Sequence, residues 1–189
     1  MEELTYILSG IHPYVTAIHL REKQRTAREL YQTINLLTKA KIPLEKLIIN
    51  DRIDVALATG VNGVQLAFHS LDVSVAKVKF PGLAVGCSIH SMEEGQRVSQ
   101  NGADYVLYGH IFPSSSKSGL KPRGLGQLKR LTESLTIPVI AIGGITPENA
   151  IHTIHHGAAG IAVMSGILQA RDPVSAAKAY KRVLQNGDV

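Results

Sequence analysis

Short runs rich in β-branched residues alternate with segments of helical period along almost the whole chain. This alternation implies helical crossovers, which are the connections that neighbouring parallel strands require. Eight such units predict a parallel (β/α)8 TIM barrel, although a doubly wound open sheet would also explain the alternation. We expect strands at Tyr6 to Leu8, Ala17 to Leu20, Leu47 to Ile49, Gly63 to Leu66, Ala84 to Ser88, Tyr105 to Tyr108, Val139 to Ile142 and Gly160 to Val163.

The intervening helices have their own start and stop signals. Thr26 to Leu37 places apolar residues on one face, and Thr146-Pro147 and Asp172-Pro173 each combine an N-cap with proline at the first helical position. Gly102 and Gly157 predict helix-to-strand turns. Only eight residues separate the first two expected strands, so the barrel should have a shortened or missing first helix.

Size and composition favour one folded domain spanning residues 1–189. Acidic residues follow Met1 where a secretory signal would be basic, and no run has the length of a membrane span, so we expect a cytoplasmic protein with no membrane partner. The net charge of +5 comes from 20 Lys and Arg scattered among 15 acids, without aromatic clustering. A small anionic substrate therefore explains the charge at least as well as nucleic acid, which we do not expect as a partner.

In an eight-stranded barrel the active site lies where the strands end, and phosphate is commonly bound after the last two strands. Gly143-Gly144 and Ser165-Gly166 stand at those two positions, and glycine lets backbone N–H groups approach an anion closely. Either pair alone would indicate only a tight turn. Together they predict a phosphate site in two adjacent loops.

Four further residues are candidates for contacts with a substrate. His19, Arg21 and Lys23 alternate along one strand, so they share a side, and Arg21 is the stronger candidate for holding a second anionic group. His110 directly follows an expected strand and precedes a long polar loop, where an imidazole can exchange protons near neutral pH. No spacing indicates a metal cage, and we expect no metal site.

Several stretches together resemble the thiamin phosphate synthase superfamily, over nearly the whole chain. They are Ile18-His-Leu-Arg-Glu-Lys23, Asn50-Asp-Arg52, Gly86-Cys-Ser-Ile-His90, Gly102-Ala-Asp-Tyr105, Ala141-Ile-Gly-Gly-Ile-Thr-Pro147 and Ala162-Val-Met-Ser-Gly166.

Two subfamilies compete within this resemblance: Mg²⁺-dependent thiamin phosphate synthases and metal-independent TenI-like thiazole tautomerases. Asp51 matches one aspartate that the synthases use for Mg²⁺, but Ser70 stands where the second is expected, and Asp72 would have to shift to replace it. His110 matches the catalytic histidine of the tautomerases, where synthases have proline. Ser114-Ser-Ser-Lys117 and Ser88 still resemble synthase phosphate contacts.

On this balance we expect a thiazole tautomerase, an isomerase that needs no cofactor and aromatises a carboxylated dihydrothiazole phosphate. His110 would be its acid/base. The alternatives are a divergent Mg²⁺-dependent synthase and a non-catalytic regulator that binds a thiazole phosphate. A homodimer is the default expectation. The resemblance and the strand ends together place phosphate at Gly143, Gly144, Met164, Ser165 and Gly166, and substrate at Arg21, Lys23, Asn50, Gln65, Ser88, Ser114, Ser116 and Lys117.

Overall fold

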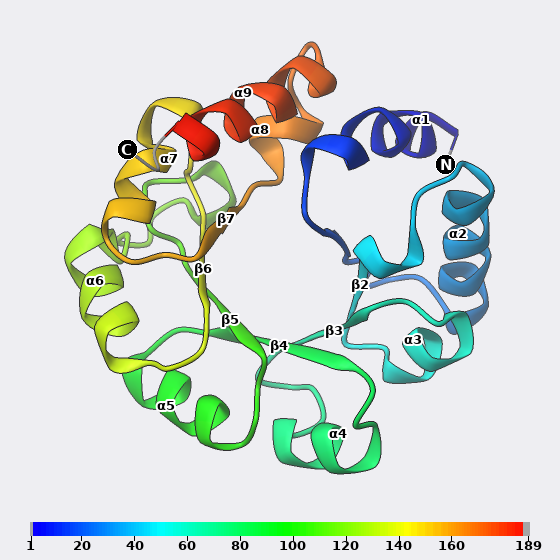
Figure 1. Cartoon of the computed structure of the whole chain (residues 1–189), viewed down its shortest axis with the longest axis horizontal. Helices are drawn as coiled ribbons and strands as arrows, with labels where there is room; N and C mark the ends of the chain where they lie inside the picture. The colour runs from blue at the N-terminus through cyan, green and yellow to red at the C-terminus, as the bar shows by residue number, and fades with distance from the viewer. Residues whose placement is uncertain (1, 187–189) are drawn as a thin grey trace.

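A curved parallel sheet with helices on its outer face organises the molecule, as seen in a computed structural model that describes residues 2–186 (Figure 1). Every strand pairs in parallel with the next strand along the chain. The strands are β1 (Ile18–Leu20), β2 (Leu47–Asn50), β3 (Gly63–Leu66), β4 (Ala84–Ile89), β5 (Tyr105–Gly109), β6 (Val139–Ile142) and β7 (Gly160–Ala162).

Helices connect the strands and form a ring around them (Figure 1). The α-helices are α1 (Glu2–Ile11), α2 (Ala27–Lys39), α3 (Ile53–Thr59), α4 (Val73–Lys79), α5 (Met92–Gln100), α6 (Gly124–Ser134), α7 (Pro147–His155), α8 (Ser165–Leu168) and α9 (Pro173–Asn186). Short 3₁₀ turns occur at η1 (His12–Tyr14), η2 (Leu44–Lys46) and η3 (Ser115–Lys117). Among these described elements, no helix is both long and apolar enough to cross a membrane.

The hydrophobic core lies between the sheet and the helices. Alternate strand residues point outward and are fully buried there, for example Leu47, Val64, Val85 and Val106. The opposite set of residues faces the inside of the curve. The sheet therefore separates an apolar outer layer from an inner surface that is free to carry polar side chains.

The predicted first strand is wrong, because Tyr6 to Leu8 lies within helix α1. Its apolar residues recur at Leu4, Ile7, Leu8 and Ile11, which is the spacing of one helix face, and this face packs on the core. The sheet accordingly has seven strands curled into a half-barrel rather than eight in a closed ring, and β1 and β7 are its edges. The expectation of a shortened or missing first helix depended on that strand; residues 9–16 instead contain the end of α1 and the 3₁₀ turn η1, which lead into β1.

The other seven strands and the helix starts are confirmed within one or two residues. Thr26 caps α2 by accepting a hydrogen bond from the Glu29 amide, at 3.3 Å. Thr146 caps α7 with Pro147 at its first position, and α9 begins at Pro173 as expected. Gly102 and Gly157 both have positive φ at helix ends.

Candidate active site

The inner surface of the sheet carries a row of polar side chains in register. The pairings Asn50 with Gln65, Gln65 with Gly86, and Gly86 with Tyr105 bring residues of four neighbouring strands onto the same face. Gln65 is 2% exposed, and its Nε2 donates a hydrogen bond to Ser88 Oγ at 3.1 Å. The structure thus brings the predicted residues Asn50, Gln65 and Ser88 together.

Gly86 allows the side chains of this row to pack closely, because Tyr105 and Gln65 fill the space that a side chain at position 86 would need. A Cβ atom on Gly86 would lie 2.1 Å from Tyr105 Cζ and 2.5 Å from Gln65 Oε1. Within the described residues, Gln65 Oε1 and the Tyr105 hydroxyl are buried and lack hydrogen-bond partners. Because such groups are costly to leave unpaired, they are suited to bind polar atoms of a ligand.

His19 closes the row on the edge strand β1. Its ring meets the Tyr105 ring edge-on, with 6.2 Å between centroids. His19 is exposed by surface area, yet desolvation by the neighbouring protein lowers the pKa of its imidazole to about 4. The imidazole is therefore neutral at physiological pH and can donate or accept a hydrogen bond inside the curve.

His110 packs directly on the predicted phosphate loop at the end of β6. A Cβ atom on Gly143, whose φ is +97°, would lie 2.4 Å from His110 Cβ, so only glycine allows this approach. The Ile111 and Phe112 amides donate hydrogen bonds to the carbonyls of Ile142 and Gly143, each at 3.0 Å. The structure therefore joins the His110 segment to one half of the predicted anion site.

The His110 side chain is buried and turned toward the polar loop that follows it. Because a carbonyl oxygen only accepts, the 3.3 Å contact of His110 Nε2 with Leu120 O requires Nε2–H as the donor. The Arg123 amide also donates to His110 O at 2.9 Å. His110 thus fixes both ends of the loop from residue 111 to 122.

The second half of the predicted anion site begins α8. Met164, Ser165 and Gly166 precede the first hydrogen bonds of this helix, which run from Ile167 and Leu168 to Met164 O. Amides at such a start have no partner within the helix and are available to an anion. Because β6 and β7 are paired through Ile142 and Ala162, this turn lies beside Gly143-Gly144.

Tyr180 of α9 connects the two halves, and sequence reasoning missed it. Its hydroxyl donates to Ile145 O at 3.0 Å, and a Cβ atom on Gly166 would lie 2.4 Å from the same hydroxyl oxygen. Burial raises the pKa of Tyr180, and Glu148 adds to the rise, so the hydroxyl stays protonated. No local pattern around Tyr180 distinguishes it from a core residue of an amphipathic helix.

The remaining predicted residues follow β1 and β5, and all of them except the half-buried Ser114 are exposed. Arg21 and Lys23 follow β1, and within residues 2–186 they have no hydrogen-bond or ion-pair partner. Ser114 and Lys117 line a cavity of about 440 Å³ formed by residues 113–120, and Ser116 lies in the same loop. Within this loop the Lys117 amide donates a hydrogen bond to Ser114 O at 3.0 Å.

The residues considered for a metal are separated in the structure. Asp51 Oδ2 lies 3.8 Å from His69 Nε2, whereas Ser70 Oγ accepts a hydrogen bond from the Ala67 amide. Asp72 caps α4 by accepting from the Ser74 amide at 2.8 Å. Within the described part of the chain, no three His, Cys, Asp or Glu residues form a metal-binding group.

Comparison with known proteins gives the family directly. The model of the family described as thiamine monophosphate synthase matches residues 2–167. The chain belongs to this family. Individual relatives agree with this assignment. The thiamine-phosphate synthase of Chlorobium luteolum is 44% identical over 174 residues, which cover 88% of this chain and 80% of that protein. The thiamine-phosphate synthase of Pyrococcus furiosus is 36% identical over 186 residues, which cover 97% of this chain and 89% of that protein.

Solved structures agree with the family. A thiamine phosphate pyrophosphorylase from Pyrococcus furiosus superposes with a TM-score of 0.85 at 32% identity, covering 99% of this chain and 91% of that one. A 3-hexulose-6-phosphate synthase superposes with a TM-score of 0.75 at 18% identity, covering 96% and 93%, which shows a shared fold alone. The curved parallel sheet is thus consistent with a TIM-like fold.

The predicted thiazole tautomerase is wrong, as is the metal-independent isomerase that it implied. Relatives that are 36% to 44% identical over most of the chain are named thiamine-phosphate synthases. The prediction gave Ser70 and His110 more weight than the rest of the sequence. The resemblance to the wider superfamily is confirmed.

Proposed function

We propose that this chain is a thiamine-phosphate synthase, a transferase that joins a pyrimidine diphosphate to a thiazole phosphate and releases pyrophosphate. The observation that carries the proposal is the adjacency of two anion-binding loops, at Gly143-Gly144 and Ser165-Gly166, within a chain that aligns with synthases along 88% to 97% of its length. Such a reaction needs sites for two phosphorylated substrates. We assign one to the loops after β6 and β7 and the other to residues that follow β1 and β5.

The phosphate of the thiazole is assigned to the two adjacent loops. Gly143 and Gly144 have positive φ, which turns the backbone there, and Asn149 Nδ2 fixes the turn by donating to Gly144 O at 3.1 Å. Fixed amides bind a phosphate without reorganising, so the ring that it carries is held in one orientation. Met164, Ser165 and Gly166 complete the cradle.

The diphosphate is assigned to the cationic and hydroxyl groups that follow β1 and β5. Cations neutralise the charge that develops on a departing diphosphate, and serine hydroxyls donate hydrogen bonds to its oxygens. The residues proposed for this role are Arg21, Lys23, Ser114, Ser116 and Lys117. Asn50, Gln65 and Ser88 then face the pyrimidine between the two phosphate groups.

The residues at the end of β2 fit a Mg²⁺ ion that the protein would hold by few ligands of its own. Proteins commonly hold Mg²⁺ by one or two carboxylates together with substrate phosphates, and Asp51, which directly follows Asn50 at the end of β2, would provide one carboxylate. When bound, the ion would neutralise charge on the diphosphate. Asp72 is engaged in capping α4, so we do not assign it a metal contact.

His110 is assigned a positioning role under this proposal. Its Nε2–H holds Leu120 O, and its carbonyl holds the Arg123 amide, so the loop that carries Ser114, Ser116 and Lys117 starts and ends at one residue. Holding the loop keeps its donors near the diphosphate. No proton transfer by His110 is needed for the coupling.

Pyrophosphate release by the purified protein tests the proposal. The assay supplies the pyrimidine diphosphate, the thiazole phosphate and Mg²⁺, with each omitted in turn and with a chelator in a further arm. We expect release only when both organic substrates are present. No release under conditions in which the Pyrococcus furiosus relative is active would overturn the proposal, as would binding of both substrates without turnover.

A matched pair of variants tests the assigned diphosphate site. Lys117→Gln should lower kcat/KM about ten- to hundredfold, because a hydrogen bond to a charged group contributes about 1.5–3 kcal/mol. Lys121→Gln removes the same charge from an exposed position near the end of the same loop and should change kcat/KM less than about twofold. Equal effects of the two variants would exclude the assignment of Lys117.

A further inference from the structure

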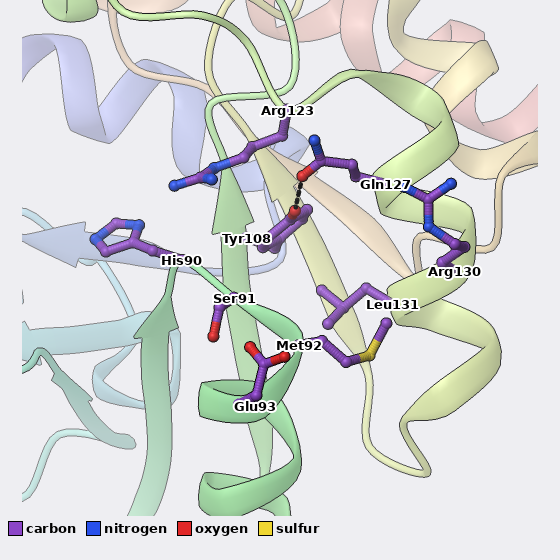
Figure 2. A pocket seen from close by; sticks show the side chains of 9 residues that line it. All are labelled: His90, Ser91, Met92, Glu93, Tyr108, Arg123, Gln127, Arg130 and Leu131. Carbon is purple, nitrogen blue, oxygen red and sulfur yellow. Dashed lines mark hydrogen bonds between the residues drawn. The ribbon is translucent and has the colours of Figure 1, made fainter.

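A second concave site, which no residue of the phosphate loops lines, lies on the outer side of the sheet. The cavity has a volume of about 210 Å³ and lies between the start of α5 and the helix α6 (Figure 2). Tyr108 forms its floor, and the register places Tyr108 in the outward-facing row with Val106 rather than in the inner row. The sheet therefore separates this cavity from the inner surface that carries Gln65 and Tyr105.

Two guanidinium groups border the cavity without counter-ions. Figure 2 shows Arg123 extending above Tyr108 toward His90, whereas Arg130 projects from α6 beyond Gln127. Across the described chain, residues 2–186, neither guanidinium has a hydrogen-bond or ion-pair partner. Two unpaired cations beside one concave surface are typical of an anion site.

Both guanidinium groups influence the pKa of the same phenol, that of Tyr108. Burial raises the pKa of Tyr108, and the charges of Arg123 and Arg130 oppose that rise. The Tyr108 hydroxyl donates a hydrogen bond to Gln127 Oε1 at 3.1 Å, which fixes the floor between the two cations. Tyr108 and Gln127 thus form a hydrogen-bonded floor, which the two guanidinium groups border.

The start of α5 forms one wall of the same cavity. Ser91 caps this nine-residue helix by accepting from the Glu94 amide at 3.2 Å, and Ser91 and Met92 both line the cavity. Glu93 is the only acidic residue among those lining it, and a hydrogen bond with Ser91 lowers the pKa of Glu93. The two guanidinium groups outnumber this one carboxylate, so the lining has a net positive charge even when His90 is neutral.

We propose that this cavity binds the phosphate group of a small molecule, at a second anion site distinct from the Gly143-Gly144 and Ser165-Gly166 loops. Its volume is below the about 300–1,000 Å³ of pockets for drug-sized ligands, so it suits inorganic phosphate or a small phosphate monoester. Arg123 and Arg130 would contact the phosphate oxygens from two sides. The inference does not depend on the proposed synthase activity.

Titration of isotopically labelled protein with inorganic phosphate, followed by amide NMR, tests the proposal. The amides of Met92, Glu93 and Gln127 report on the cavity, and those of Gly143 and Gly144 report on the phosphate loops in the same spectra. We expect saturable shifts at the cavity amides. A second titration with glycerol phosphate distinguishes a preference for a monoester from one for the free ion.

Variants of one helix provide the control. Arg130→Gln should weaken phosphate binding at the cavity amides about tenfold and leave binding at Gly143 and Gly144 unchanged. Lys129→Gln removes the same charge from the neighbouring position, where Lys129 is paired with Glu133 at 3.8 Å, and should change binding less than about twofold. Arg123→Gln should repeat the Arg130→Gln result. Absent or non-saturating shifts at the cavity amides, or equal effects of Arg130→Gln and Lys129→Gln, would overturn the proposal.

Discussion

Tyr180 contacts both phosphate loops through one hydroxyl group, so its removal should loosen both. Tyr180→Phe deletes the hydrogen bond to Ile145 O and costs about 0.5–1.5 kcal/mol. We expect the KM for the thiazole phosphate to rise severalfold while kcat changes little, because the hydroxyl does not touch the reacting atoms. Tyr6→Phe, at an 82% exposed position of α1, is the control. An unchanged KM in Tyr180→Phe would show that the hydrogen bond from Tyr180 to Ile145 O is not needed to hold the two loops.

His19 gives a prediction for pH. Its pKa of about 4 in the folded chain lies below the ordinary value near 6.5, so between these pH values only the unfolded chain gains a proton at His19. Its contribution to stability is complete above pH 6.5 and is lost as the pH falls toward 4. His19 is exposed to solvent, so the effect on stability is small.

Urea unfolding at pH 7 and pH 5 measures this effect. The wild-type chain should lose more stability on acidification than His19→Gln does, and NMR should give the imidazole a midpoint near pH 4. A midpoint near 6.5 would disprove the claimed burial effect.

Sequence reasoning found the residues of the site that lie in strands or just after them, and missed those that act from a distance. Asn50, Gln65 and Ser88 meet because parallel register fixes their neighbours. Tyr180 is 35 residues from its partner Ile145, and no short motif encodes that contact. The role of Gly86 becomes apparent only in the structure, where the Tyr105 ring fills the space that a side chain at position 86 would need.

At the scale of the element, two glycines of α6 should respond oppositely to alanine. Gly126 has a negative φ and open space at its Cβ position, so Gly126→Ala should stabilise the fold by about 0.5–1 kcal/mol. Gly124 has φ +74° at the helix start, so Gly124→Ala should destabilise it by about 1–2 kcal/mol. Chemical denaturation of both variants checks the pair. A stabilising Gly124→Ala would contradict the backbone described for this turn.

Helix α1 explains the failure of the eight-strand prediction. A three-residue apolar run such as Tyr6 to Leu8 does not distinguish a strand from a buried helix face. The longer spacing through Leu4 and Ile11 carries the helical signal. The seven correct strands were each followed by a complete helical segment, which provided the second signal that Tyr6 to Leu8 lacked.

In the molecule as a whole, the first and last helices pack together where the sheet is open (Figure 1). A Cβ atom on Gly10 would lie 2.7 Å from Val174 Cγ2. Because valine has little rotamer freedom, Gly10→Ala should destabilise the fold by about 1–3 kcal/mol despite the better helix propensity of alanine. Val174→Ala should restore most of that loss in the double variant. Additive effects in this double-mutant cycle, followed by thermal unfolding, would contradict close packing of α1 on α9.

The central claim is that this chain makes thiamine phosphate with the phosphate of the thiazole held by the Gly143-Gly144 and Ser165-Gly166 loops. The most direct measurement follows product formation by mass spectrometry, with the pyrimidine diphosphate and either the thiazole phosphate or the unphosphorylated thiazole alcohol. The account predicts product from the phosphate, with kcat/KM at least about a hundredfold higher than with the alcohol, since the charged hydrogen bonds are lost. No coupled product, or equal kcat/KM for both thiazoles, would contradict it.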